Sequence, residues 1–302
     1  MKKFTKGALI TALVFVILGF TLCVAGAGIG SNYSTIIEMI RNGELSINLG
    51  DFSDWSEWDS ETTEEYTFTE TESSLISKLD VDIESGSLII KEVEDNQGVK
   101  VEIKYRKENS KRNINVYKEN DTFKIEESGY KSFFNNDDVC IILQIPADME
   151  FTNVDLRNSA GEITIENEIK AENFSIIVDA GECNVCNKLK VSGTLYAEVG
   201  AGEIDFDNVE TQNLELDCGV GEINIAQATA KDVDLDCGVG EINITLEAAE
   251  EDYSYSVDCG IGEVSVGESN YSGLGTTKEI KGGRNDMNID CGIGEVTVEF
   301  TK

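Results

Sequence analysis

The sequence predicts an all-β protein: a β-solenoid of about eight rungs with an N-terminal β meander, preceded by one transmembrane helix. Three observations support this prediction. A glycine-acid-apolar unit recurs about every 20 residues, polar and apolar residues alternate with period two from Leu79 onward, and residues 8–30 are almost entirely apolar. Short repeats that cannot bury an apolar face alone are typical of solenoids, and about 20 apolar residues suffice to span a bilayer.

The repeat is defined by a glycine followed by glutamate. Its seven copies place this glycine at Gly161, Gly181, Gly202, Gly221, Gly240, Gly262 and Gly294. Successive spacings are 20, 21, 19, 19, 22 and 32 residues. An eighth, degenerate copy is VDIESGSLII at 81–90, where Gly86 takes the glycine position. Stacked copies would bury one continuous core between them.

A glycine corner is expected inside each unit. The ten residues LDCGVGEINI occur at 216–225 and again at 235–244. In the first copy the apolar residues are Leu216, Cys218 and Val220 before the glycine of the Gly-Glu pair, and Ile223 and Ile225 after it. The alternation therefore shifts by one residue, which a strand achieves only with a bulge or corner. Glycine supplies the backbone freedom for such a corner.

The chain divides into three parts. Residues 1–33 form a cytoplasmic tip and transmembrane anchor, and 34–77 a juxtamembrane segment and acidic linker. Residues 78–302 form an extracytoplasmic β-solenoid domain, with an N-terminal β portion at 78–147 and the glycine-acid repeats at 148–302. The linker has no Lys or Arg between Asn42 and Ser77, and such acidic composition favours an extended chain. Trp55 and Trp58 within it are either incidental or a short docking motif.

The N-terminal segment predicts membrane attachment. Lys2, Lys3 and Lys6 precede the apolar run, so the N-terminus is expected in the cytoplasm and the C-terminal domain outside the cell. A cleaved signal peptide is the alternative, because Ala25 and Ala27 resemble a cleavage site.

Two segments interrupt the repeats. Between Gly86 and Gly161, the sequences VKVEIKYRKE, INVYKEN, TFKIEES and VCIILQIP predict strands of a meander that covers or extends the N-terminal end of the solenoid. Residues 267–285 are expected to be an inserted loop. The last rung would then end at Phe300 as an open sheet edge, where homo-association or strand addition is plausible.

Composition excludes several classes of function. The chain has 302 residues, a formal net charge of −34 and no histidine. Nucleic-acid binding requires a surplus of basic residues, so nucleic acid is not expected as a partner. Without histidine, Ser-His-Asp and Cys-His catalysis and His-ligated metal sites are also excluded.

Acidic residues are the main candidates for binding. The glutamates of the Gly-Glu pairs should form one outward row, and Asp217, Asp236, Asp258 and Asp290 another. Like charges on neighbouring strands repel, so solvation, raised pKa values or bound calcium must reduce the repulsion between carboxylates within each row. The calcium candidates are Asp217, Glu222, Asp236, Glu241, Asp258, Glu263, Asp290 and Glu295. No other metal, no cofactor and no catalytic residue is expected.

Cysteines recur at one position of the repeat. Cys218, Cys237, Cys259 and Cys291 stand where other copies have Val199 or Ile83, so they are expected to face the core as buried thiols. Disulfides are the alternative outside the cell, although in-register neighbours have an awkward geometry for them. Cys183 and Cys186 form a C-x-x-C, but alternation places them on opposite faces of a strand. A structural role is therefore favoured over a metal or redox site.

The repeated units GEITI, GEIDF, GEINI, GEVSV and GEVTV, preceded by LQIPADMEF and an N-terminal membrane segment, resemble the bacterial β-strand-repeat family labelled "putative adhesin", a domain of unknown function. The resemblance covers roughly Leu79 to Phe300. It implies an envelope-associated β-solenoid, with links to envelope-stress systems and no catalytic residues. The expected function is a membrane-anchored, extracytoplasmic binding or scaffold module for an envelope protein or a wall or surface ligand, adhesin-like or part of an envelope-stress system. The alternative is a calcium-dependent polysaccharide-active β-helix enzyme.

Overall fold

A computed structural model describes residues 62–93, 98–105, 112–128 and 139–301, and this part of the chain is built almost entirely of strands. Its helical elements are α3 (Glu70–Ser73) and one 3-10 turn, η4 (Glu250–Asp252). In chain order the strands are β1 (Thr62–Thr67), β2 (Lys78–Ile83), β3 (Gly86–Glu92), β4 (Lys100–Tyr105), β5 (Ile114–Glu119), β6 (Thr122–Glu127), β7 (Val139–Ile145), β8 (Glu150–Asn158), β9 (Gly161–Ile165), β10 (Ile169–Val191), β11 (Thr194–Glu210), β12 (Asn213–Thr229), β13 (Asp232–Leu246), β14 (Tyr253–Val266), β15 (Ser269–Ile280) and β16 (Asn285–Phe300).

Each repeat contributes to two layers of sheet with the core between them. In β12, Leu214, Leu216 and Cys218 before the corner and Ile223 and Ile225 after it are all buried, with at most 2% of each side chain exposed. The first half of β10 pairs with β8 and its second half with β9, so one bent strand spans both layers. Parallel in-register stacking of such strands confirms the predicted β-solenoid.

The corner glycines align from rung to rung, as their spacing predicts. Gly86 pairs with Gly161, and the register continues without a shift to Gly240. Gly221 has φ 145°, and a Cβ placed there would overlap the carbonyl oxygen of Gly202. Glycine is therefore required at this position both for its dihedral angle and for the close approach of the neighbouring rung.

The predicted meander extends the solenoid at its N-terminal end. The four expected strands are β4, β5, β6 and β7. β6 is parallel to β2 in one layer and β7 is parallel to β3 in the other, so these two strands continue the stack by one position. β5 and β4 then pair antiparallel to β6 and β7 respectively.

The prediction of an extended acidic linker as far as residue 77 is wrong for residues 62–73, which form a paired strand and a short helix. β1 pairs antiparallel with β4, and α3 follows with a capping box in which the Thr69 backbone N–H donates to the Glu72 carboxylate (2.9 Å). Phe68 packs its ring against Phe123 with a centroid distance of 5.0 Å. Threonine, tyrosine and phenylalanine in an otherwise acidic stretch provide enough strand propensity and apolar surface for this docking. Trp55 and Trp58 lie outside the described residues.

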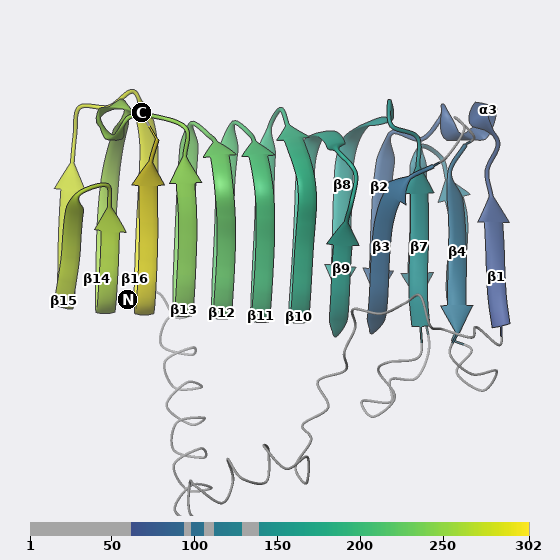
Figure 1. Ribbon diagram of the computed structural model, residues 1–302, viewed down its shortest axis with the longest axis horizontal. Coiled ribbons are helices and arrows are strands. Elements are labelled where there is room, and N and C mark those ends of the chain that lie inside the picture. The colour runs from purple at the N-terminus through teal and green to yellow at the C-terminus, as the bar shows by residue number, and fades with distance from the viewer. Residues whose placement is uncertain (1–61, 94–97, 106–111, 129–138, 302) are drawn as a thin grey trace, which may run out of the picture. The chain divides into compact units, whose positions relative to one another are not determined.

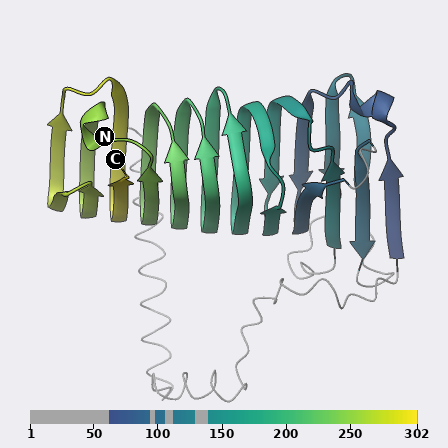
Figure 2. The same cartoon turned by 45° about the horizontal axis from the view of Figure 1, so that its top comes forward.

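The C-terminal strand β16 does not lie at the end of the stack. β16 lies between β13 and β14 and is parallel to both, while β15 forms the edge by pairing antiparallel with β14 (Figures 1 and 2). The inserted segment 267–285 is thus largely strand, not loop, and the expected open edge at Phe300 is wrong. β16 fits this place because its inward residues repeat those of β13, with Cys291 level with Cys237 and Val296 level with Ile242.

No helix among the described residues is long and apolar enough to cross a membrane. The apolar run at 8–30, where the transmembrane anchor is expected, lies outside those residues.

Candidate functional site

Two rows of carboxylates flank the glycine corners. Glu162, Glu182, Glu203, Glu222, Glu241, Glu295 and Glu263 are in register in that order, which confirms the predicted glutamate row. The aspartate row runs Asp217, Asp236, Asp290, Asp258 and is continued by Glu198 on β11. Since neighbouring strands lie about 4.8 Å apart, each row carries roughly one carboxylate per 4.8 Å.

Partial burial and crowding raise the pKa values of several of these carboxyl groups. Burial raises the pKa of Asp217, with a smaller contribution from Glu198. Burial also raises the pKa of Asp236, with Asp217 and Asp234 adding to it. In the glutamate row, burial and then Asp205, Glu222 and Glu182 raise the pKa of Glu203. The charged form of these side chains is therefore less stable in the folded protein than in water.

Side-chain amides donate hydrogen bonds to carboxylates in and beside the glutamate row. Asn243 donates from Nδ2 to Glu241 Oε1 (2.8 Å) and to Asn224 Oδ1 (3.0 Å), and Asn224 donates to Asp205 Oδ1 (2.9 Å). Asp205, Asn224 and Asn243 therefore form a hydrogen-bonded ladder two residues after the glutamate row. The amides disperse part of the negative charge across rungs without adding a cation.

The calcium prediction gains no geometric support. Across the described ranges, no group of three or more His, Cys, Asp or Glu side chains is arranged to hold a metal ion. Calcium takes six to eight oxygen ligands, whereas a straight row of strands presents carboxylates side by side. Calcium binding at Asp217, Glu222 and their neighbours in the rows therefore stays a prediction.

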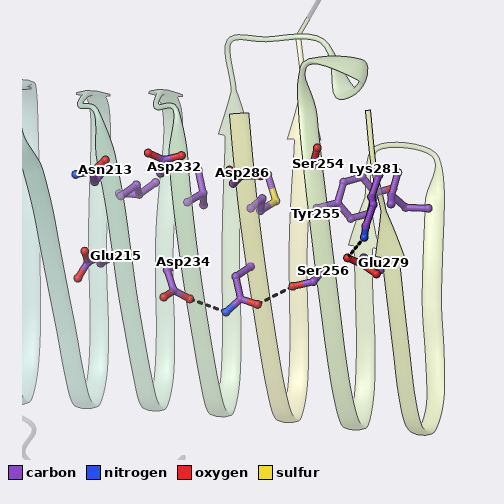
Figure 3. A pocket seen from close by; sticks show the side chains of 15 residues that line it. Asn213, Glu215, Asp232, Asp234, Ser254, Tyr255, Ser256, Glu279, Lys281 and Asp286 are labelled. Atoms are coloured by element: carbon purple, nitrogen blue, oxygen red, sulfur yellow. Dashed lines mark hydrogen bonds and ion pairs between the residues drawn. The ribbon is translucent and has the colours of Figure 1, made fainter. Parts of the chain in front are cut away.

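A concave groove of about 760 Å³ crosses the first halves of β12, β13, β16 and β14 and reaches the edge strand β15 (Figure 3). Ser254 and Ser256 on β14 have short side chains, and the longer side chains of Glu279 and Lys281 rise beside them from the end of β15 and the residue after it. Asn288 bridges the neighbouring strands, donating to Asp234 Oδ1 (3.0 Å) and accepting from Ser256 Oγ (2.7 Å). The groove depends on both β15 and the insertion of β16.

The groove is acidic and rich in hydrogen-bonding groups. Of the described residues that line it, Lys281 alone is basic, and its Nζ lies 2.8 Å from Glu279 Oε1. The lining carboxylates are Glu215, Asp232, Asp234, Glu279 and Asp286. This combination suits a ligand that carries amines or hydroxyls. Sequence reasoning missed the groove because it treated residues 267–285 as a loop, although Ser269–Ile280 contains β-branched and aromatic residues typical of a strand.

The two serine hydroxyls in the groove are not activated as nucleophiles. Ser256 donates to the Asn288 amide oxygen, and Ser254 donates to the Gly283 carbonyl oxygen (3.1 Å), so neither hydroxyl contacts a base. The chain has no histidine. A serine nucleophile requires an adjacent general base, so neither Ser254 nor Ser256 is arranged as a nucleophile.

The repeated cysteines lie inside the core, as predicted. Cys218, Cys237, Cys291 and Cys259 stack in that order and have no exposed surface. They are free thiols, and hydrogen bonding of the Cys237 thiol to Cys218 and Cys291, followed by burial, raises the pKa of Cys237. A buried thiol with a raised pKa is a poor nucleophile and behaves as a small apolar residue.

The C-x-x-C motif is split between two faces. Cys183 is buried with 1% exposure, whereas Cys186 is exposed on the outer side of β10. The two sulfurs therefore cannot bind one metal ion together, which confirms the prediction drawn from strand alternation.

Comparison with known proteins identifies relatives of this fold. The sequence model of the family described as Toastrack DUF4097 matches residues 76–279. No curated protein matches the chain.

A solved structure of a "putative adhesin" from Bacteroides fragilis is similar, with a TM-score of 0.52 and 16% identity over 78% of this chain and 96% of that one. A "putative adhesin" from Parabacteroides merdae has a TM-score of 0.47 and 16% identity, covering 80% and 96% of the two chains. A "putative lipid binding protein" from Parabacteroides distasonis has a TM-score of 0.45 and 14% identity, covering 78% and 96%. At such low identity, the first of these structures supports the fold alone.

Proposed function

The chain belongs to the Toastrack DUF4097 family, and we propose that it is a non-catalytic binding and scaffold module of the bacterial cell envelope. The proposal rests on the acidic groove formed by β12, β13, β16, β14 and β15. Carboxylates, amides and hydroxyls line this groove, and its two serine hydroxyls are not activated as nucleophiles. The groove lies on stacked strands paired in register, so the binding groups are held on a rigid surface.

A polar ligand is the natural occupant of the groove. Its carboxylates would accept hydrogen bonds from amines or hydroxyls, and Ser254, Ser256 and Asn288 offer both donors and acceptors. Wall glycans that carry amino groups and basic segments of envelope proteins both have this chemistry. An adhesin-like role or a place in an envelope-stress system would follow from which of them binds.

Membrane attachment is part of the proposal. The apolar residues 8–30 would anchor the protein, and Lys2, Lys3 and Lys6 would keep its N-terminus in the cytoplasm. The folded domain would then lie outside the cell, where the envelope ligands are. Homo-association is proposed at the edge strand β15 instead of at Phe300, because β15 pairs with β14 on one side and forms the end of the strand order.

Exposed Cys186 provides the test of location. In intact cells, a membrane-impermeant maleimide should label Cys186 in a Cys23→Ser background, whereas Cys186→Ser should remove the signal. Labelling only after the membrane is broken would contradict an extracytoplasmic domain.

The test of binding uses the full-length protein and purified wall polysaccharide with and without its amino groups acetylated. Wild-type protein should retain the amine-bearing polymer, and Asp234→Asn/Glu279→Gln should reduce retention at least threefold. The matched control is Glu210→Gln/Asp207→Asn, which removes the same charge outside the groove. Equal retention by the groove variant and the control would contradict the groove as the site.

A further inference from the structure

A row of exposed apolar side chains runs along the glycine corners. In the corners of the strands from β11 to β14, one residue stands between two glycines. From β11 to β14 these residues are Ala201, Val220, Val239, Ile293 and Ile261, and they are in register on consecutive strands. We call this set the corner crest. Val220 is 55% exposed, Ile293 45% and Ile261 58%, although in the sequence Val220 continues the alternation of buried Leu216 and Cys218.

The exposure follows from the corner itself. The flanking Gly219 and Gly221 have no side chains, and the backbone turns from one layer to the other between them. Val220 therefore points away from both layers instead of into the core. Exposed Val220, Ile293 and Ile261, with half-buried Val239 between the first two and the small Ala201 at one end, form one apolar stripe. Such stripes on protein surfaces usually mark an interaction surface.

The crest lies between the two carboxylate rows. The aspartate row is three residues before it and the glutamate row two residues after it on every strand from β12 to β14, so both rows lie within about 10 Å of the crest. Basic residues are almost absent from this region: between Val191 and Thr277 the sequence contains only Lys231. Its Nζ donates to Gln212 Oε1 (3.0 Å) in the turn at the opposite end of the rung.

The pattern specifies the surface of a partner. A complementary surface needs an apolar stripe with positive charges along both margins. An amphipathic helix with Lys or Arg at the borders of its apolar face presents this arrangement. A single extended strand does not, because alternate side chains point to opposite faces. Divalent cations would neutralise the rows but would leave Val220, Ile293 and Ile261 in water.

Length and spacing agree with a helix lying along the crest. Five strands at about 4.8 Å span about 19 Å, which corresponds to roughly 13 residues or 3.5 turns of helix. Crest side chains repeat about every 4.8 Å, close to the helical pitch of about 5.4 Å, so they can enter the grooves between successive turns.

We propose that the corner crest and its two carboxylate rows form a docking surface for a basic amphipathic helix of a partner protein or peptide. The surface is separate from the acidic groove and goes beyond the proposed function. Binding should be reduced by salt, because most of the attraction comes from exposed charges.

The experiment titrates full-length protein with a labelled 18-residue peptide of Leu and Lys whose lysines border an apolar stripe. A scrambled peptide of the same composition, without the stripe, is the peptide control. The crest variant is Val220→Ser/Ile293→Ser/Ile261→Ser. The matched protein control is Leu75→Ser, a 61% exposed apolar residue between α3 and β2 and outside the crest. Circular dichroism and the Tm establish that each variant is folded.

The amphipathic peptide should bind with a Kd on the order of 10 µM. The crest variant and the scrambled peptide should each bind at least tenfold more weakly, while Leu75→Ser and the charge control Glu210→Gln/Asp207→Asn should change the Kd less than twofold. Equal binding of both peptides would overturn the proposal by showing charge attraction alone.

Two other occupants of the crest would also overturn the proposal. One outcome is calcium at millimolar concentration raising the Tm and abolishing peptide binding, which would make the rows a cation site. The other is wild-type protein that dimerises and a crest variant that is monomeric, which would make the crest a self-association surface. Loss of groove binding with crest binding intact would refute only the proposed function.

Discussion

Cys237 lies directly beside Cys291 in the core, although Cys259 is much nearer to it along the chain. Cys291 in turn lies beside Cys259, so the thiols stack in an order that differs from their order in the sequence. This relationship follows from the insertion of β16 between β13 and β14. The C-terminal strand therefore completes the interior of the sheet, and β15 is left as its edge.

Hydrogen exchange tests the position of β16. Amides of β16 are bonded to strands on both sides and should be among the most protected, whereas outward-facing amides of β15 should exchange fastest among the repeat strands. Exchange measured by mass spectrometry on peptides covering 285–300 and 269–280 would show the difference. Faster exchange in 285–300 than in 269–280 would indicate sequential stacking and contradict the insertion.

The corner glycines provide a prediction that separates dihedral strain from steric overlap. Gly221 and Gly282 have similar φ angles of 145° and 138°, but a Cβ on Gly282 meets no atom within 4 Å. Gly282→Ala should therefore cost about 1–2 kcal/mol of unfolding free energy from strain alone. Gly221→Ala should cost at least about 3 kcal/mol, because its Cβ would also overlap the Gly202 carbonyl oxygen. Urea denaturation of both variants measures the difference, and equal losses would contradict the close approach of the rungs.

Glycine spacing was sufficient to predict the corners and the in-register acid rows. Each unit of about 20 residues has one place, beside a glycine, where the apolar alternation shifts, and such a shift requires a bulge or a corner. The order of the strands was not predictable in the same way. The inward residues of β13, β14 and β16 are so similar that any order of these three would bury the same kinds of side chain.

The groove and the corner crest could not be predicted from the alternation of polar and apolar residues in the sequence. The groove needs β15, whose Gly273 and Gly275 weakened the strand signal, and it needs Asn288 placed beside Ser256 by the insertion. Val220 continues the apolar alternation of β12, so its exposure became evident only from the path of the backbone between Gly219 and Gly221.

Thiol chemistry tests the burial of the cysteines. In folded protein with the Cys23→Ser change, iodoacetamide should modify Cys186 while Cys140, Cys183, Cys218, Cys237, Cys259 and Cys291 stay unmodified, because those six are buried. Burial, with Asp207 and Glu166, raises the pKa of Cys186, so its modification should be slower at pH 7 than that of a free peptide thiol. Peptide mass spectrometry identifies the modified sites, and urea should expose all of them. Modification of Cys237 before unfolding would contradict the stacked core.

The carboxylate rows predict how stability depends on pH. Because burial and neighbouring acids raise the pKa values of Asp217 and Asp236 in the folded protein, the stability that these groups contribute is fully present below their unfolded pKa of about 4. It is lost as the pH rises through their higher folded values. Asp217→Asn/Asp236→Asn should therefore raise the Tm by about 1–3 °C at pH 7 and change it little near pH 4.

Glu210→Gln is a control for which the expected change in Tm at pH 7 has the opposite sign. A hydrogen bond and ion pair with Lys188 (2.8 Å) lower the pKa of Glu210, so its contribution is present above the unfolded pKa and is lost as the pH falls. Its replacement should lower the Tm slightly at pH 7, by no more than about 2 °C because the pair is exposed. Calorimetry between pH 4 and 8 at low salt measures both variants, and added salt should shrink the effect of Glu210→Gln by screening its ion pair. A fall in Tm at pH 7 for Asp217→Asn/Asp236→Asn would mean that the charged aspartates stabilise the fold, which would contradict a destabilising effect of their burial and of the neighbouring acids.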